Sequence, residues 1–117
     1  MTSTPECRGI VAFDGEGAAV GLVLFGLVAG AQGTGAIYWL AVRPDRRHRG
    51  IGRALLAVAR TELVAEHARI IVAELRDDPE TAAMGKMLAA GGFAREGTVP
   101  DFYSDGVPLG LWRYAAT

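Results

Sequence analysis

The sequence predicts a mixed α/β domain with helices packed on a mostly antiparallel sheet, in the order β-β-β-α-β-α-β-β. Short runs rich in β-branched and aromatic residues alternate with glycine turns, which is typical of strands joined by hairpins. Two longer segments place apolar residues at the 3.6-residue spacing of an amphipathic helix. The chain has 117 residues, of which 50% are hydrophobic, and this is the size of one domain with its own core. We therefore expect residues 1–117 to form a single domain.

Three strands are expected before the first helix. Residues 8–13 and 20–28 flank Asp14-Gly15-Glu16-Gly17, a hairpin signal because glycine supplies the positive φ of a tight turn. Residues 36–42, with the sequence AIYWLAV, are apolar at every position, so we expect a central strand that is buried on both faces. Pro44 ends this strand because proline cannot donate a hydrogen bond to a sheet.

The two expected helices each have one apolar face. The first follows Gly50-Ile51-Gly52, and its apolar face consists of Leu55, Leu56, Ala59 and Leu63. The second begins at Asp78-Pro79, an N-cap followed by proline, and ends at Gly91-Gly92. Its apolar face consists of Ala83, Met84, Met87 and Leu88.

Three further strands are expected, at residues 70–75, 93–99 and 108–114, and the last two are joined by a loop at 101–107. The strand–helix–strand crossover from residue 36 to residue 75 implies parallel neighbours with a right-handed connection.

Composition and charge exclude several classes of protein. A net charge of −1 argues against a general polyanion binder. The single cysteine, Cys7, excludes a disulfide scaffold, and His48 and His67 lack the spacing of a metal motif, so no metal site is expected. Residues 17–42 carry no charge, but glycines interrupt them, and their most apolar part, 18–31, is too short for a bilayer core of ~30 Å. Without a targeting signal, we expect a cytoplasmic protein that does not contact membranes.

The segment from Val42 to Arg53, with the sequence VRPDRRHRGIGR, joins the predicted central strand to the first helix. A helix N-terminus leaves backbone N–H groups unpaired and carries a partial positive charge, so it favours anions. Glycines let a diphosphate approach the backbone closely, and Arg47, Arg49 and Arg53 add charge beside it. Together with Arg46, these arginines place positive charge at the positive end of the helix dipole, which lowers the stability of the fold unless an anion is bound. The segment predicts an anion site, and the alternative is a solvated basic loop.

Arg47-His48-Arg49-Gly50-Ile51-Gly52 resembles the Gln/Arg-x-x-Gly-x-Gly/Ala signature of the GNAT superfamily of N-acetyltransferases. The longer run WLAVRPDRRHRGIGRALL and the later GGF resemble the same family, and the resemblance extends from Arg8 to the C-terminus. It implies acetyl-coenzyme A (acetyl-CoA) as cosubstrate and direct transfer of the acetyl group to an amine of a small molecule or protein. It also implies that the pyrophosphate binds the main chain at Arg47, His48, Arg49, Gly50, Ile51, Gly52 and Arg53, and that the pantetheine arm pairs with the strand edge at Leu40, Ala41 and Val42.

The chain departs from the family pattern in two ways. Family members usually carry one more strand and two helices before the hairpin, which help to form the acceptor site. We therefore expect a short form whose acceptor site is open or is completed by a partner chain. Leu88 stands where members often have a tyrosine that protonates the departing thiolate, and leucine cannot donate a proton.

Two residues are candidates for proton transfer. The Tyr103 phenol, with an ordinary pKa of about 10, is matched to a thiolate leaving group and is the candidate acid. Glu74 occupies a strand where family enzymes sometimes place a general base. For Tyr103 the alternative is an aromatic side chain that packs at the domain edge. For Glu74 the alternative is a half-exposed strand residue with no catalytic role. Tyr38 and Trp39 are expected to line the pocket or the core.

Three functions compete at this point. The first is an acetyl-CoA-dependent N-acetyltransferase, and the second is a catalytically weak module that binds CoA for regulation or assembly. The third is a nucleic-acid-binding domain using the arginine cluster, but the net charge of −1 and the lack of aromatic residues in the cluster argue against it. Residues 8–13 are the expected edge of the sheet, and because unpaired edges are usually covered we expect a homodimer.

Overall fold

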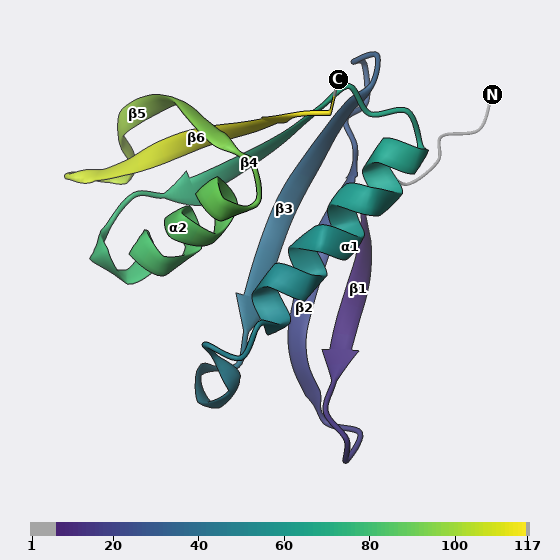
Figure 1. Ribbon diagram of the computed structural model, residues 1–117. Helices are drawn as coiled ribbons and strands as arrows, with labels where there is room; N and C mark the ends of the chain where they lie inside the picture. The colour runs from purple at the N-terminus through teal and green to yellow at the C-terminus, as the bar shows by residue number, and fades with distance from the viewer. Residues whose placement is uncertain (1–6, 117) are drawn as a thin grey trace.

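The computed structural model describes residues 7–116, which form one six-stranded sheet with strand order β1-β2-β3-β4-β6-β5 (Figure 1). In chain order the elements are β1 (Arg8–Phe13), β2 (Ala19–Leu27), β3 (Thr34–Val42), α1 (Ile51–Ala65), β4 (Ile70–Arg76), α2 (Ala82–Ala90), β5 (Ala94–Ser104) and β6 (Val107–Ala115). Only the β3–β4 pair is parallel among these neighbours. The predicted order and the mixed, mostly antiparallel sheet are confirmed.

Short-range hydrogen bonds close two of the predicted turns. In the β1–β2 hairpin the Asp14 carboxylate accepts hydrogen bonds from the N–H groups of Glu16 and Ala18, at 2.8 and 2.9 Å. Before α2, Asp78 and Thr81 form a reciprocal capping box around a single 3-10 turn, Pro79–Thr81. Asp78 is therefore an N-cap, as the Asp-Pro pair predicts, but it caps the 3-10 turn, and α2 begins later, at Ala82 with Thr81 as its N-cap.

β3 and β4 are paired only at their beginnings, from Thr34 opposite Ile70 to Ile37 opposite Ala73. Beyond this point they diverge, so that β1–β3 form one arm of the sheet and β4, β6 and β5 form the other (Figure 1). We call the gap between the diverging strands the fork. A β-bulge lies at the same level, because Leu24 pairs with Trp39 and Phe25 with Ile37, which leaves Tyr38 as an extra residue in β3.

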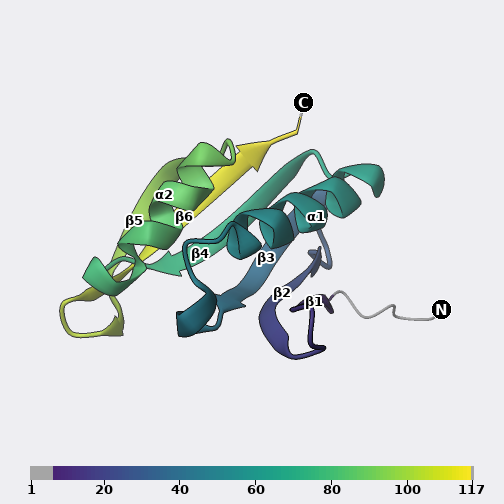
Figure 2. The same cartoon turned by 60° about the horizontal axis from the view of Figure 1, so that its bottom comes forward.

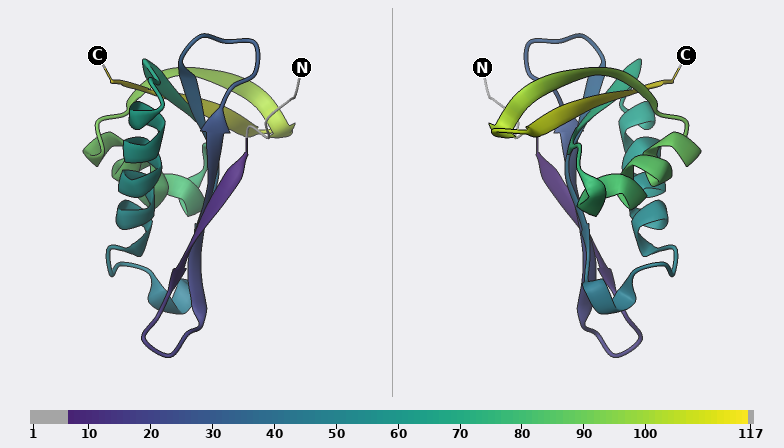
Figure 3. Two further views of the ribbon diagram at one scale, coloured as in Figure 1. Left: turned by 90° about the vertical axis from the view of Figure 1, so that its right-hand side faces the viewer. Right: turned by 90° about the vertical axis from the view of Figure 1, so that its left-hand side faces the viewer.

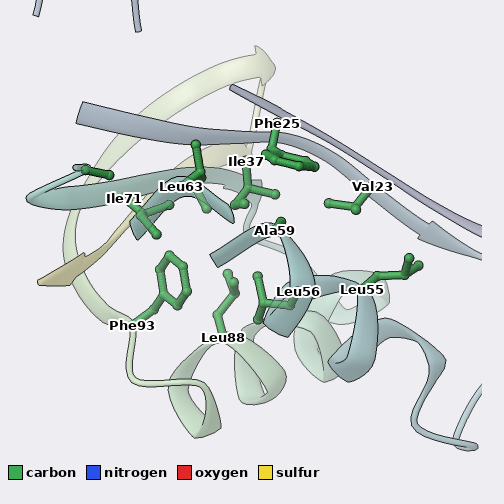
Figure 4. Close-up of a cluster of buried hydrophobic side chains, with 12 residues drawn as sticks. Val23, Phe25, Ile37, Leu55, Leu56, Ala59, Leu63, Ile71, Leu88 and Phe93 are labelled. Atoms are coloured by element: carbon green, nitrogen blue, oxygen red, sulfur yellow. The ribbon is translucent and has the colours of Figure 1, made fainter. Parts of the chain in front are cut away.

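Both helices pack on the same face of the sheet (Figures 2 and 3). The predicted apolar face of α1, Leu55, Leu56, Ala59 and Leu63, is buried with at most 4% exposure. α2 adds Leu88, and Phe93 follows it into the same core, where side chains from both helices and the strands meet (Figure 4). The core therefore lies between the helices and the sheet, and it holds the start of α1 next to the end of β3.

Three expectations are corrected by the structure. Tyr38 and Trp39 are 47% and 60% exposed, so β3 is not buried on both faces. Residues 101–104 continue β5 and are not a loop, with the irregular part of the strand between Val99 and Ser104. Ala83 is exposed on α2, because the short helix turns only part of the predicted face toward the core. No helix within residues 7–116 has the length and apolar character needed to cross a membrane.

Candidate active site

The loop between β3 and α1 presents a continuous row of unpaired backbone N–H groups. Among residues 7–116, none of the N–H groups from Arg47 through Arg53 donates a hydrogen bond to the protein. His48 and Gly50 have φ angles of 65° and 83° within this row. Gly50 is the N-cap of α1, and its carbonyl accepts the N–H of Ala54 at 3.0 Å. Such a row at a helix N-terminus is suited to an anion with several oxygens.

Two other arginines of this segment, Arg43 and Arg46, are engaged by carboxylates. Asp45 accepts two hydrogen bonds from Arg43, at 3.1 and 2.7 Å, and one from Arg46 at 3.1 Å. Arg46 also reaches Asp14 of the β1–β2 turn at 3.3 Å. The Arg43 guanidinium lowers the pKa of Asp45, and the backbone N–H groups of Ala18 and Glu16, with Arg46, lower the pKa of Asp14. Arg43 and Arg46 therefore hold the loop in place.

The remaining arginines of the loop have no carboxylate partner among the described residues. Arg49 and Arg53 are exposed, and Arg47 donates a hydrogen bond to the carbonyl of Val42 at 3.2 Å. The unpaired charge at the N–H row is therefore that of Arg47, Arg49 and Arg53, the three residues that the sequence predicts beside the anion. Sequence reasoning missed the pairing of Arg46, because Asp14 lies 32 residues away along the chain.

The end of β3 has one free edge beside this loop. Leu40, Ala41 and Val42 pair with β2 on one side, and no described strand lies beside them on the side of the fork. The second glycine of the motif lies next to this edge, because a Cβ at Gly52 would be 3.5 Å from Val42 and 3.2 Å from the Met87 sulfur. Gly52 thus permits close packing of α1 against β3 and α2. The free edge, the N–H row and the start of α1 adjoin one another.

The two candidates for proton transfer lie at different places on the arm formed by β4, β6 and β5. Glu74 is the first residue of β4 beyond the last pair with β3 and is exposed, and its carboxylate forms no hydrogen bond or ion pair with another residue of 7–116. Tyr103 lies near the tip of the β5–β6 hairpin, 46% exposed, with its ring edge-to-face against Phe102 at 4.9 Å between centroids. Figure 1 shows this hairpin tip and the β3–α1 loop on different arms of the sheet. Leu88 is 2% exposed and belongs to the core.

A groove of about 420 Å³ lies between α1 and α2, next to the loop. At one end is Arg53, and at the other Arg60 donates a hydrogen bond to the Gly91 carbonyl at 2.6 Å and lies over the Tyr114 ring. The helical spacing of apolar residues in α1 does not predict this groove. The groove is formed by the side of α1 that faces away from the sheet and by the turn after α2.

Residues 1–88 match the sequence model of the acetyltransferase (GNAT) family. The chain belongs to the GNAT acetyltransferase family. This confirms the resemblance inferred from the glycine motif. A comparison with curated proteins found no sequence match.

Solved GNAT structures share the fold. A protein from Desulfovibrio desulfuricans that is assigned to the GNAT family is 27% identical, with a TM-score of 0.87 over 96% of this chain and 71% of its own. The ribosomal-protein-S18-alanine N-acetyltransferase of Escherichia coli is 18% identical, with a TM-score of 0.82 over 98% of this chain and 72% of its own. A protein from Bacillus anthracis assigned as a streptothricin acetyltransferase, in complex with acetyl coenzyme A, is 17% identical, with a TM-score of 0.84 over 97% of this chain and 65% of its own. The last two comparisons support the fold alone.

Proposed function

We propose that this GNAT protein transfers the acetyl group of acetyl-CoA to an amine of a small molecule or protein. The observation that carries the proposal is the row of unpaired N–H groups from Arg47 through Arg53, beside three arginines without carboxylate partners among the described residues. A diphosphate offers the negative oxygens that such a row can bind. The Bacillus anthracis neighbour, whose structure contains acetyl coenzyme A, is consistent with this ligand.

The rest of the cosubstrate would follow the free edge of β3. The amide groups of a pantetheine arm can pair with the backbone of Leu40, Ala41 and Val42 as an added strand would. The arm would then run from the loop into the fork, toward the level of Glu74. This path brings the thioester to the place where the two arms of the sheet diverge.

The reaction requires two proton transfers. The amine nitrogen bonds to the thioester carbonyl carbon, the C–S bond breaks, and CoA leaves as a thiolate. Glu74 would accept the proton lost by the amine, through water, because its carboxylate is exposed and unpaired at the fork. Tyr103 would donate a proton to the thiolate, for which the hairpin must approach the fork. A thiolate is a fair leaving group, so the first transfer matters more than the second.

Replacement of Gly50 tests the cosubstrate site. A Cβ at Gly50 meets no atom within 4 Å, and aspartate is among the residues that adopt positive φ, so G50D should fold with some backbone strain at φ 83°, while its carboxylate repels a diphosphate at the N–H row. Each charge-assisted hydrogen bond that is lost contributes about 1.5–3 kcal/mol, so we expect CoA affinity to fall by roughly two decades or more in calorimetry. G50N is the matched control, because asparagine has the same shape without charge and tolerates positive φ. A G50D protein with unchanged CoA affinity would refute the site.

The second candidate function is a CoA-binding module with little catalytic power. Burial of Leu88 in the core favours it, because this position then supplies no acid next to the thioester. Thiol release from acetyl-CoA with a panel of amines separates the two functions. An enzyme releases thiol with at least one amine, whereas a binding module binds CoA and releases none.

We also propose a cytoplasmic homodimer without metal, membrane or nucleic-acid partners. β1 is an edge strand of the described sheet, and Val11 and Phe13 on it are 42% and 64% exposed. A free edge with apolar side chains is commonly covered by another chain. Light scattering at high micromolar concentration should give the mass of two chains, and the mass of one chain would contradict the dimer.

A further inference from the structure

The face of β1–β3 opposite α1 is apolar where β3 reaches the fork. Cross-strand pairs place Val11 beside Leu22 and Leu24 beside Trp39. A Cβ at Gly9 would lie 2.8 Å from the Leu24 side chain, so Leu24 points to the same face as position 9 of β1, and Val11, two residues further along β1, shares that face. No helix of residues 7–116 covers this face (Figure 3). We call the surface formed by Val11, Leu22, Leu24 and Trp39 the apolar face.

The bulge at Tyr38 turns Trp39 onto the apolar face. Without it, Ile37 and Trp39 would share a face by the alternation of a strand, and Ile37 is in the core. The extra residue keeps Ile37 inside and directs Trp39 outward, next to Leu24 and at the diverging end of β3. Trp39 is 60% exposed in this position. A large indole is thus held at the proposed site of transfer with most of its surface available to a ligand.

Glu74 supplies a single negative charge across the fork. Glu74 pairs with Leu111 of β6, which is 36% exposed. The preceding pair, Ala73 and Trp112, faces α2 and the core, so Glu74 and Leu111 lie on the other face of the sheet. The nearest arginines along these strands are occupied: Arg76 by Asp78 and Glu80, and Arg113 by Glu96. The fork therefore offers an apolar platform on one side and one unpaired carboxylate on the other.

We propose that the acceptor is a monoamine with an aromatic or similarly apolar body, which stacks on Trp39 and points its ammonium group to Glu74. The indole removes the apolar body from water, and the Glu74 carboxylate pairs with the ammonium group. A polyamine carries several positive charges, and among the described residues one unpaired carboxylate, that of Glu74, lies at the fork. A small polar amine would leave the Trp39 indole exposed to water. This inference rests on the proposed function, of which it names the substrate class.

Amine binding gives a test that does not depend on turnover. Dissociation constants are measured by calorimetry for 2-phenylethylamine, ethanolamine, spermidine, a short peptide with a free α-amine and the uncharged 2-phenylethanol, on the protein alone and with saturating CoA. We expect 2-phenylethylamine to bind at least tenfold more tightly than each of the others. Thiol release with acetyl-CoA is measured on the same compounds.

Variants assign the preference to the two residues. W39A should remove most of the difference between 2-phenylethylamine and ethanolamine, and W39F should keep part of it because a smaller ring remains. E74Q should remove the preference for 2-phenylethylamine over 2-phenylethanol. V64A is the control, because Val64 is an exposed apolar residue, 40%, on α1, the helix on the other face of the sheet. It should leave all of the dissociation constants unchanged.

The outcomes separate this inference from the proposed function. Preferential binding that depends on Trp39, without thiol release, supports the inference and contradicts the acetyltransferase activity. Equal or tighter binding of ethanolamine, spermidine or the peptide overturns the inference, as does a preference that survives W39A. Failure of every amine to bind overturns it as well.

Discussion

Single backbone conformations at His48 and Gly50 give the β3–α1 loop the geometry on which the proposed anion site rests. Both residues have positive φ, and the chain continues from Gly50, the N-cap, into the first turn of α1. Alternation of this kind turns successive N–H groups toward one side, where they can surround an anion. Histidine is among the few residues with a side chain that adopt positive φ with some frequency, and glycine does so without steric cost. The loop is therefore shaped before any ligand arrives.

Gly50 and Gly52 have different roles, although the sequence motif treats them alike. Gly50 has open space around its Cβ position and is required for its φ of 83°. Gly52 is required for contact, since a Cβ there would approach the Met87 sulfur at 3.2 Å. A substitution at Gly52 therefore disturbs the packing of α1 against α2 as well as the ligand site, and Gly50 is the cleaner position for an experiment.

Replacement of Tyr103 by phenylalanine distinguishes an enzyme that uses this acid from one that does not. Y103F keeps the ring that packs on Phe102, so CoA affinity should be unchanged. If the phenol protonates the thiolate, turnover should fall by ~10²–10⁴-fold, the usual contribution of a positioned general acid. Steady-state thiol release measures this directly. Turnover within a few-fold of the wild type would remove Tyr103 from the mechanism.

The carboxylate of Asp14 links the stability of the protein to pH. Hydrogen bonds from the N–H groups of Ala18 and Glu16, and the Arg46 guanidinium, lower its pKa below the ordinary 3.8. The stabilisation is therefore present above the unfolded pKa and is lost as the pH falls through the folded pKa. We expect the urea midpoint to fall as the pH is lowered through and below the ordinary pKa of 3.8, and to fall less steeply in D14N. Identical slopes for the two proteins would show that Asp14 is not a source of the acid sensitivity.

At the scale of elements, the apolar face of α1 was predictable because the helix has one periodic pattern, and the residues of that pattern all face the core between the helices and the sheet. The behaviour of β3 was not predictable in the same way. Its run AIYWLAV is apolar throughout, so no alternation marks the bulge at Tyr38 or the change of face at Trp39. The extension of β5 to Ser104 also lacked a signal, since Pro100 and Asp101, with a φ of 55° at Asp101, are typical of a turn.

The packing of α1 on the sheet can be tested by truncation at the buried face. Leu63 is fully buried, and its side chain lies against Gly35 of β3. The contact is close, because a Cβ added to Gly35 would lie only 2.9 Å from a methyl group of Leu63. L63A should lower the free energy of unfolding by about 2–5 kcal/mol, because it removes buried methyl groups and leaves a cavity. V64A, at the neighbouring position with 40% exposure, is the matched control and should change it by less than about 0.5 kcal/mol. Urea denaturation gives both values, and equal effects would contradict the predicted orientation of α1.

At the scale of the whole molecule, the site is formed where segments distant in sequence meet. The glycine motif predicts the loop and its ligand class, because the motif is local. The role of Arg46 depends on Asp14 of the first hairpin, and the fork depends on where β3 stops pairing with β4. Local patterns cannot report such contacts. The sequence therefore indicates Tyr103 as a candidate acid only through the chemistry of its phenol. The position of Tyr103 relative to the fork depends on the whole β5–β6 arm.

Ligand binding at this loop should stabilise the entire fold, because α1 belongs to the core. A ligand that binds only the folded state adds about 2.7 kcal/mol at a concentration of 100 Kd, which corresponds to a rise in Tm on the order of 10 °C for a domain of this size. The contacts of a diphosphate with Arg47, Arg49, Arg53 and the N–H row are electrostatic and exposed, so salt should screen them. Thermal unfolding with a fixed CoA concentration should therefore show a large shift at about 0.1 M NaCl and a much smaller one at about 1 M NaCl. G50D should show little shift at either salt concentration. A shift of the same size at both salt concentrations, or an equal shift in G50D, would place the bound CoA away from the loop.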